Sequence, residues 1–103
     1  MIFAILSQGN LNNANQKKLI IYGSGEAGVQ SLNVLSRNNQ YYVEAFLDDD
    51  YSKIGRQINN KPIIGIDKLE EFIRVKKISS IFVAIPSLDL KKRQEIVSKL
   101  EKF

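Results

Sequence analysis

Four short apolar runs along the chain predict β-strands, because each is followed directly by a glycine, a proline or an aspartate. These runs cover residues 19–22, 42–47, 62–64 and 81–85. Three other segments carry apolar residues at helical spacing and predict α-helices. They cover about residues 25–36, a segment that begins at Asp67, and about residues 89–102.

The resulting order, βαββαβα, predicts an α/β, Rossmann-like fold with a mostly parallel four-stranded sheet and helices on both faces. Right-handed crossovers then place the strands in the order 62–64, 42–47, 19–22, 81–85. Residues 51–60 predict a loop in which Gly55 and Asn59-Asn60 suit turns.

Each predicted helix has an apolar stripe that we expect to face the sheet. The stripes are Gly28, Leu32 and Leu35; Leu69, Phe72 and Ile73; and Ile96, Val97 and Leu100. Asp67 is expected to cap the second helix, with Glu70 three residues later as in a capping box.

The N-terminal residues 1–16 differ from the rest of the chain. Residues 2–6 are apolar and residues 7–16 are polar and asparagine-rich, which indicates a linker. The apolar residues are either a stray strand or the remainder of a longer hydrophobic segment. The domain itself is expected to cover residues 17–103.

Composition narrows the chemistry. The chain has 103 residues, enough for one domain, and a net charge of +4 that favours anionic ligands only slightly. It has no cysteine and no histidine, which excludes disulfides, thiolate nucleophiles, imidazole bases and zinc sites of the Cys/His type. The apolar run at residues 2–6 is too short to span a bilayer, so we expect a soluble, cytoplasmic chain.

The most informative stretch follows the first predicted strand. It reads Gly23, Ser24, Gly25, Glu26, Ala27, Gly28 and matches G-x-G-x-x-G. Gly23 suits a tight turn, Gly25 leaves room for a pyrophosphate, and Gly28 allows close packing of helix on strand. The N–H groups of the helix then face the phosphates. The alternative is that these glycines only make a tight connection between strand and helix.

Asp48 lies twenty residues after Gly28, at the end of the second strand, where an acid accepts hydrogen bonds from a ribose. A carboxylate there disfavours a 2′-phosphate. Asp49 is the alternative acceptor, and the other acids of the 48–50 run are expected to be turn residues.

The end of the fourth strand, Ile85, Pro86 and Ser87, is expected to lie beside the glycine turn and contact a ring or a ribose. Ser87 could equally cap the last helix. Glu26 stands in the first helical turn, where the helix dipole favours an acid.

Basic residues mark the last helix: Lys91, Lys92, Arg93, Lys99 and Lys102. We interpret them as a solvated face, with an anionic membrane surface as the alternative. Nucleic acid is not expected as a partner, because aromatic residues are not interleaved with these charges. No tyrosine has a lysine four residues later, so the Tyr-x-x-x-Lys pair of short-chain reductases is missing. We therefore expect no turnover by this chain alone.

Five blocks together resemble a known domain. They are residues 19–28, 45–50, 53–55, 62–65 and 83–87. They resemble the N-terminal Rossmann-like, or CoA-binding-like, domain of membrane-bound nucleoside-diphosphate-sugar epimerase/dehydratases, the bacterial polysaccharide biosynthesis proteins. Where that family usually has glycine before the third strand, this chain has Asn60, which tolerates a left-handed conformation.

This resemblance implies a nucleotide-binding domain whose partner is a catalytic short-chain dehydrogenase domain that binds NAD and acts on UDP-sugars. It implies a parent protein anchored in the inner membrane. NAD is the expected cofactor, with CoA or a UDP-sugar as alternatives, and homo-oligomerisation is left open. Related domains precede sugar-phosphate transferases and sugar O-acetyltransferases. A stand-alone ligand-sensing or interaction module is the other alternative.

Overall fold

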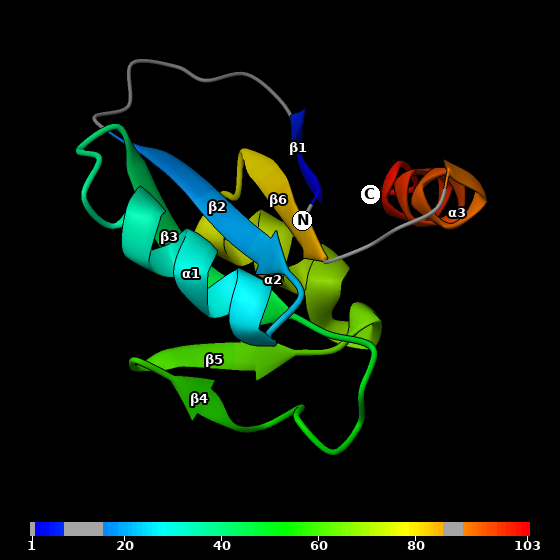
Figure 1. The fold of residues 1–103 in the computed structure, drawn as a ribbon, viewed down its shortest axis with the longest axis horizontal. Helices are drawn as coiled ribbons and strands as arrows, with labels where there is room; N and C mark the ends of the chain where they lie inside the picture. Colours follow the sequence, from blue (N-terminus) through cyan, green and yellow to red (C-terminus); the bar gives the residue numbers. More distant parts are fainter. Residues whose placement is uncertain (1, 8–15, 86–89) are drawn as a thin grey trace.

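The structure is a computed structural model that describes residues 2–7, 16–85 and 90–103. Its centre is a six-stranded sheet in the order β1-β6-β2-β3-β5-β4 (Figure 1). The strands are β1 (Ile2–Ser7), β2 (Lys17–Tyr22), β3 (Tyr41–Leu47), β4 (Gln57–Ile58), β5 (Lys61–Ile64) and β6 (Ser80–Ile85). The helices are α1 (Glu26–Leu35), α2 (Leu69–Lys76) and α3 (Leu90–Leu100), with a 3-10 turn, η1 (Ile66–Lys68), directly before α2.

The four strands expected from sequence form the parallel centre of this sheet. β2 pairs in parallel with both β3 and β6, and β3 pairs in parallel with β5. The predicted order is therefore confirmed, as is the α/β, Rossmann-like class. Two short elements extend the sheet at its edges: β1 pairs antiparallel with β6, and β4 pairs antiparallel with β5.

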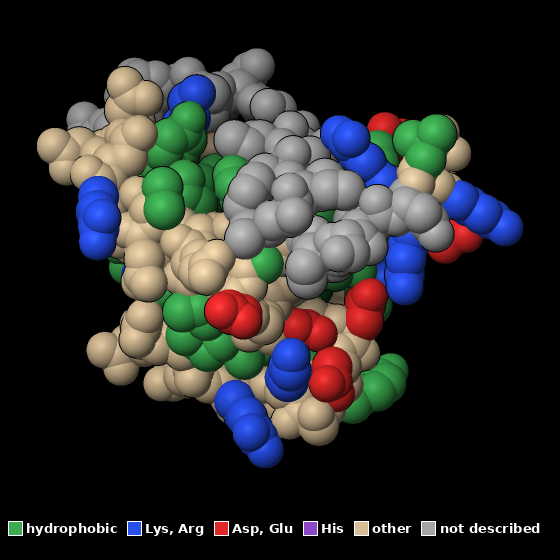
Figure 2. All heavy atoms as spheres, viewed as in Figure 1, with side chains coloured by type: hydrophobic (Ala, Val, Ile, Leu, Met, Phe, Trp, Pro, Cys, Tyr) green, Lys and Arg blue, Asp and Glu red, His purple; other side chains and the backbone are tan. Residues whose placement is uncertain are grey.

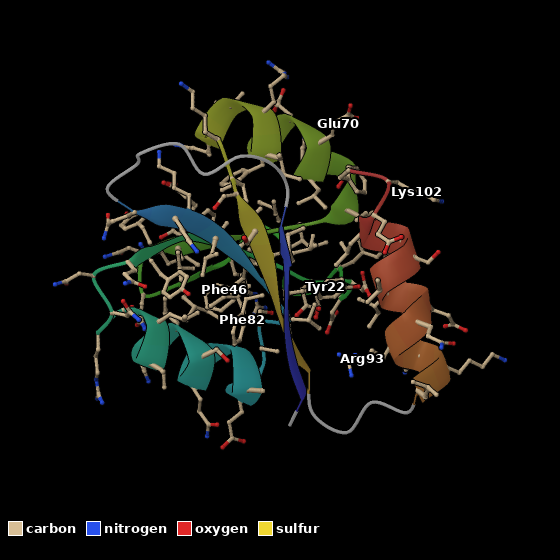
Figure 3. The ribbon with its side chains drawn as sticks, turned by 90° about the horizontal axis from the view of Figure 1, so that it is seen from above. Tyr22, Phe46, Glu70, Phe82, Arg93 and Lys102 are labelled. Atoms are coloured by element: carbon tan, nitrogen blue, oxygen red, sulfur yellow. The ribbon has the colours of Figure 1, made fainter. Side chains whose placement is uncertain are left out.

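Helices cover both faces of the sheet, and each face has its own core (Figure 3). On one face α1 packs through Ala27, Leu32 and Leu35 against Leu19, Ile21 and Phe46 of the central strands. On the other face, Leu69 of α2 and Leu100 of α3 are fully buried with Ile20 and Leu47. Neighbouring residues of β2 and β3 contribute to opposite cores, because successive side chains of a strand point to opposite faces.

The segment at 51–60, expected to be a loop, ends in a small hairpin. Asn59 and Asn60 have φ of 50° and 66°, so both adopt the left-handed conformation that joins β4 to β5. Two such residues make the tight turn whose twist suits paired strands. The tolerance expected of Asn60 is confirmed, and the missed strand β4 is only two residues long.

The start of the second helix differs from the expected capping box. Asp67 lies inside η1, and the residue before α2 is Lys68, with no side-chain cap hydrogen bond in this described segment. The 3-10 turn displaces the start of α2 to Leu69, so Asp67 and Glu70 do not flank its first turn as a capping pair. The expected inner face is nonetheless present, since Leu69 is buried and Phe72 and Ile73 pack beside it.

Most of the expected linker, residues 8–15, lies outside the described residues, whereas the apolar residues before it are described. Ile2–Ser7 form β1, which runs antiparallel along β6 from Ile2 opposite Ile85 to Ser7 opposite Ser80. A strand was one of the two readings of the apolar residues 2–6. Antiparallel pairing adds an outer strand to an otherwise parallel sheet, a common arrangement at sheet edges.

Candidate functional site

The glycine turn between β2 and α1 is shaped by two of its three glycines. Gly23 has φ of 111°, which L side chains rarely adopt. A Cβ at Gly28 would lie 1.9 Å from the carbonyl oxygen of Gly23, so α1 touches the turn backbone directly. Both positions therefore require glycine for the connection itself, whether or not a ligand binds.

Gly25 differs from these two glycines. Its φ is −83°, an ordinary value, and a Cβ built on it would meet no atom of the described residues within 4 Å. Among these residues nothing requires glycine here, and the space above Gly25 is open. Gly25 is also the residue before α1, and no described side chain caps the helix.

The start of α1 consequently presents free backbone donors beside that open space. The N–H of Val29 makes the first intrahelical bond, to the carbonyl of Gly25. The N–H groups that precede it, on Glu26, Ala27 and Gly28, have no partner within the helix. Together with the helix dipole, such groups favour an anion.

Asp48 holds the turn from the neighbouring strand. Its Oδ2 accepts hydrogen bonds from the backbone N–H of Ser24 at 2.9 Å and from the Ser24 hydroxyl. Its Oδ1 accepts the N–H of Asp50 at 2.9 Å. Burial alone would raise the pKa of Asp48, but the hydrogen bonds from Ser24 and Asp50, with the charge of Lys53, bring that pKa below its ordinary value. The carboxylate is thus ionised and keeps the glycine turn closed against β3.

The next acid of the run, Asp49, has different partners. Its Oδ2 accepts a hydrogen bond from the Tyr22 hydroxyl at 2.6 Å, and its Oδ1 pairs with the ammonium of Lys99 at 3.0 Å. The same ammonium also donates to the Tyr22 hydroxyl at 3.2 Å. Lys99 comes from α3, so this cluster of Tyr22, Asp49 and Lys99 ties the last helix to the carboxyl ends of β2 and β3.

A tyrosine and a lysine therefore meet in space although they are 77 residues apart in sequence. In a short-chain reductase the lysine lowers the pKa of its tyrosine so that the phenol can exchange protons. Here burial and the hydrogen bond to Asp49 raise the pKa of Tyr22 to about 12, against the smaller lowering effect of Lys99. Tyr22 is also only 3% exposed. This pair is a structural contact and lacks the properties of an acid/base dyad.

The acids of the 48–50 run lie where strands β2 and β3 end, next to the glycine turn. Figure 2 shows acidic side chains gathered in this region, with basic side chains beside them. Asp50 accepts hydrogen bonds from the N–H and the hydroxyl of Ser52, which closes the loop after β3. The hydrogen bonds to Asp50 from Ser52 lower the pKa of this exposed carboxyl group.

The structure divides the expected site residues into accessible and buried ones. Gly25, Glu26 and Asp49 are exposed and Asp48 is half-buried, whereas Ser24, Ala27 and Gly28 are buried. β6 lies beside β2, with Val83 opposite Tyr22, so the strand that ends at Ile85 reaches the same edge of the sheet. Pro86 and Ser87 lie outside the described residues. Tyr22 and Lys99 were missed from sequence, because nothing in their local pattern indicates that they meet.

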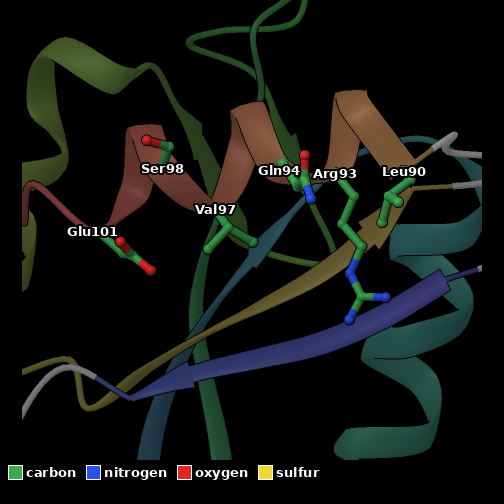
Figure 4. A pocket seen from close by; sticks show the side chains of 6 residues that line it. All are labelled: Leu90, Arg93, Gln94, Val97, Ser98 and Glu101. Atoms are coloured by element: carbon green, nitrogen blue, oxygen red, sulfur yellow. The ribbon is translucent and has the colours of Figure 1, made fainter.

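A separate groove of about 410 Å³ runs along α3. It is lined by Leu90, Arg93, Gln94, Val97, Ser98 and Glu101 (Figure 4). None of these residues belongs to the glycine turn or the aspartate run. Val97, expected to face inward, lines this groove and is partly exposed.

The described residues contain no group of three or more acids that could hold a metal ion. None of the helices within 2–7, 16–85 and 90–103 has the length and hydropathy needed to cross a membrane.

The sheet order, the glycine turn and the acid at the end of β3 define a Rossmann-like domain. Residues 18–100 match the family model of the PglD N-terminal domain. The chain belongs to this family.

Among solved structures, the chain is similar to UDP-D-quinovosamine 4-dehydrogenase from Vibrio fischeri. The TM-score is 0.78 with 33% identity, over 84% of this chain and 71% of that one. It also shares its fold with RSP, a Rex-family repressor, whose complex with β-NADH has a TM-score of 0.64 and 21% identity, over 84% of this chain and 41% of the other. These neighbours agree with the Rossmann-like class.

A relative in sequence is the redox-sensing transcriptional repressor Rex of Carboxydothermus hydrogenoformans. It is 30% identical over 74 residues, which make up 71% of this chain. The chain spans about a third of that repressor's length, 36%. Because a transcriptional repressor is among the relatives, the comparisons give no support to the expectation that nucleic acid is not a partner.

Proposed function

We propose that this chain binds a nucleoside diphosphate at its glycine turn, as the nucleotide-sugar-binding domain of a larger protein. The observation that carries the proposal is Gly25. A turn kept only for folding needs glycine at Gly23 and Gly28, where φ or packing demands it. Gly25 has neither need, and it lies in open space at an uncapped helix start within the described chain, where a pyrophosphate would approach the backbone.

The comparisons support this ligand class. The chain belongs to the PglD N-terminal domain family, and the similar dehydrogenase from Vibrio fischeri is named for a UDP-sugar. A second candidate, NAD(H), is favoured by the likeness to a Rex-family repressor in complex with β-NADH. UDP-sugars and NAD(H) share the diphosphate and a ribose with a free 2′-hydroxyl, and CoA shares the diphosphate.

Asp48 is the proposed ribose acceptor. The hydrogen bonds that it already accepts limit how many more it can accept. Its Oδ2 already accepts two hydrogen bonds from Ser24, and its Oδ1 accepts one from Asp50. A carboxylate has about four lone-pair sites, so one remains for a ribose hydroxyl. Asp49, the alternative acceptor, is held toward α3 by Tyr22 and Lys99, whereas Asp48 contacts the glycine turn through Ser24.

The identity of the larger parent protein is proposed from the family resemblance of the sequence, not from contacts within this domain. A membrane-anchored polysaccharide-biosynthesis dehydratase or epimerase, with an NAD-binding catalytic domain after this one, remains the proposed parent. The N-terminal domain of a sugar acetyltransferase is the alternative. The binding test below does not depend on which parent is correct, because it measures binding by this chain alone.

The sharpest test compares Gly25→Val with the unmutated chain by titration calorimetry against UDP-N-acetylglucosamine, NADH and CoA. The branched side chain fills the open space, so we expect at least a tenfold loss of affinity, about 1.4 kcal/mol or more. Asp48→Ala would not test ribose binding alone, because it also removes the hydrogen bonds that Asp48 accepts from Ser24.

Gln30→Val is the matched control, since Gln30 is an exposed residue of the same helix. It should leave the affinity unchanged. The ligand that binds most tightly identifies the nucleotide class. If none of the three binds the unmutated chain at millimolar concentration, the proposal fails and the glycine turn is a structural connection.

A further inference from the structure

The carboxyl edge of β3 carries negative charges that would repel the proposed nucleotide. This inference rests on the proposed function, the binding of that nucleotide. Three consecutive acids, Asp48, Asp49 and Asp50, follow the strand directly. A nucleoside diphosphate is itself an anion. Charged groups still interact appreciably when they lie within a Debye length of each other, which is about 8 Å at physiological ionic strength. The edge would repel the ligand unless some of these charges are balanced.

The three carboxylates are balanced in different ways. Asp48 and Asp50 accept hydrogen bonds from neutral donors, namely Ser24, the N–H of Asp50, and Ser52. The charge of Lys53 acts on both, without forming an ion pair among the described residues. Asp49 alone among the three has an ion pair in the described part of the chain, at 3.0 Å from the Lys99 ammonium. Hydrogen bonds shared among Asp49, Lys99 and the Tyr22 hydroxyl complete this cluster.

The direction of Asp49 is set by the strand. Phe46 packs in the α1 core and Leu47 in the opposite core, so alternation sends Asp48 toward the glycine turn and Asp49 toward α3. The Asp48 contact with Ser24 and the Asp49 contact with Lys99 agree with this alternation. The side chain of Lys99 is 38% exposed and that of Asp49 is 58% exposed, so both charges still act on solvent and on a nearby anion.

We propose that Lys99 is a positioning residue of the nucleotide site, which neutralises Asp49 and holds its carboxylate on the α3 face. The acidic edge can then accept a diphosphate while Asp48 remains available to the ribose. The last helix thereby contributes to affinity through a charge, without touching the ligand. The Tyr22 hydroxyl assists by fixing the second oxygen of Asp49.

The experiment is a double-mutant cycle on binding of the nucleotide identified above. Lys99→Met leaves Asp49 uncompensated and should weaken binding about 3- to 10-fold. Asp49→Asn removes the negative charge and should leave binding unchanged or tighten it. The double variant Lys99→Met/Asp49→Asn should restore the affinity of the unmutated chain. Raising the salt from 0.05 to about 0.5 M should shrink the Lys99→Met effect, because exposed charges are screened.

Two controls separate charge from structure. Lys91→Met removes a charge from an exposed position of the same helix and should not change affinity. Lys99→Arg keeps the ion pair and should bind like the unmutated chain. Melting temperatures of all variants show whether α3 stays in place.

Each other outcome overturns the inference in a recognisable way. If the double variant binds as weakly as Lys99→Met, Lys99 contacts the ligand itself. If Lys99→Met binds normally, the ion pair is irrelevant to the site. If the unmutated chain binds no nucleotide, the proposed function fails, and this inference fails with it.

Discussion

Asp48 and Asp49 are adjacent in sequence, yet they belong to opposite faces of the sheet and hold different parts of the molecule. Asp48 closes the glycine turn through Ser24 on the α1 face. Asp49 secures α3 through Lys99 and Tyr22 on the other face. The side of the sheet edge that faces α1 consists mainly of glycines and backbone donors. The side that faces α3 consists mainly of polar and charged side chains.

The comparison shows that position in a motif does not settle the role of a residue. Both acids stand where a ribose acceptor is expected, but only Asp48 adjoins the glycine turn. The same distinction separates Gly25 from Gly28, because one faces open space and the other meets the backbone of Gly23. Contacts within the fold therefore show which members of the motif the described chain uses for its own packing.

The largest expected effect concerns the glycines of the α1 face. Gly28→Ala places a Cβ 1.9 Å from the Gly23 carbonyl oxygen, which forces α1 away from the turn. We expect a loss of about 3 kcal/mol in the free energy of unfolding, measured by urea denaturation. Gly25→Ala is the matched control and should lose less than about 1 kcal/mol. Equal losses from the two substitutions would contradict the division between packed and open glycines.

A smaller effect is expected on the α3 face. Tyr22→Phe removes the hydrogen bond to Asp49 and should cost about 1 kcal/mol of stability. Because the pKa of Tyr22 is raised from 10.0 to about 12, its contribution is fully present below pH 10 and is lost as the pH rises through about 12.

Absorbance titration of the phenols tests this tyrosine directly. The chain has four tyrosines, and the Tyr22 phenol, with its pKa raised to about 12, should give a late ionisation step. Tyr22→Phe should remove that late step, whereas Tyr51→Phe, at a residue 89% exposed, should leave it. A late step that survives in Tyr22→Phe would assign the raised pKa to another residue.

The smallest effect concerns Asp48 in acid. Its folded pKa is below the unfolded value of 3.8, so its stabilising contribution is present above that pH and is lost as the pH falls through the folded pKa. Asp48→Asn should therefore be less stable than the unmutated chain at pH 7, and the difference should narrow below about pH 3.8. Thermal melts across pH 2 to 7 measure it. A constant difference at all pH values would show that the ionised form has no special role.

Much of the fold was predictable from local pattern. The runs at 19–22, 42–47, 62–64 and 81–85 predict buried parallel strands because they are almost wholly apolar, with Glu44 as their one charged residue. The helices carry apolar residues at helical spacing. The strand order followed from the handedness of crossovers. The short strand β4 was not assigned, because two residues carry little signal of their own, and a strand was only one of two readings of the apolar residues 2–6 that lie in β1.

By itself, the sequence determined the Rossmann-like class and the glycine turn with an acid at the end of the following strand, because these depend on residues close together in the chain. Only the tertiary structure decided which acid meets the turn, which glycine is open, and that the tyrosine at the end of the first parallel strand contacts a lysine of the last helix. Those contacts join residues 24 to 77 positions apart. They are set by packing against the sheet, which no local pattern encodes.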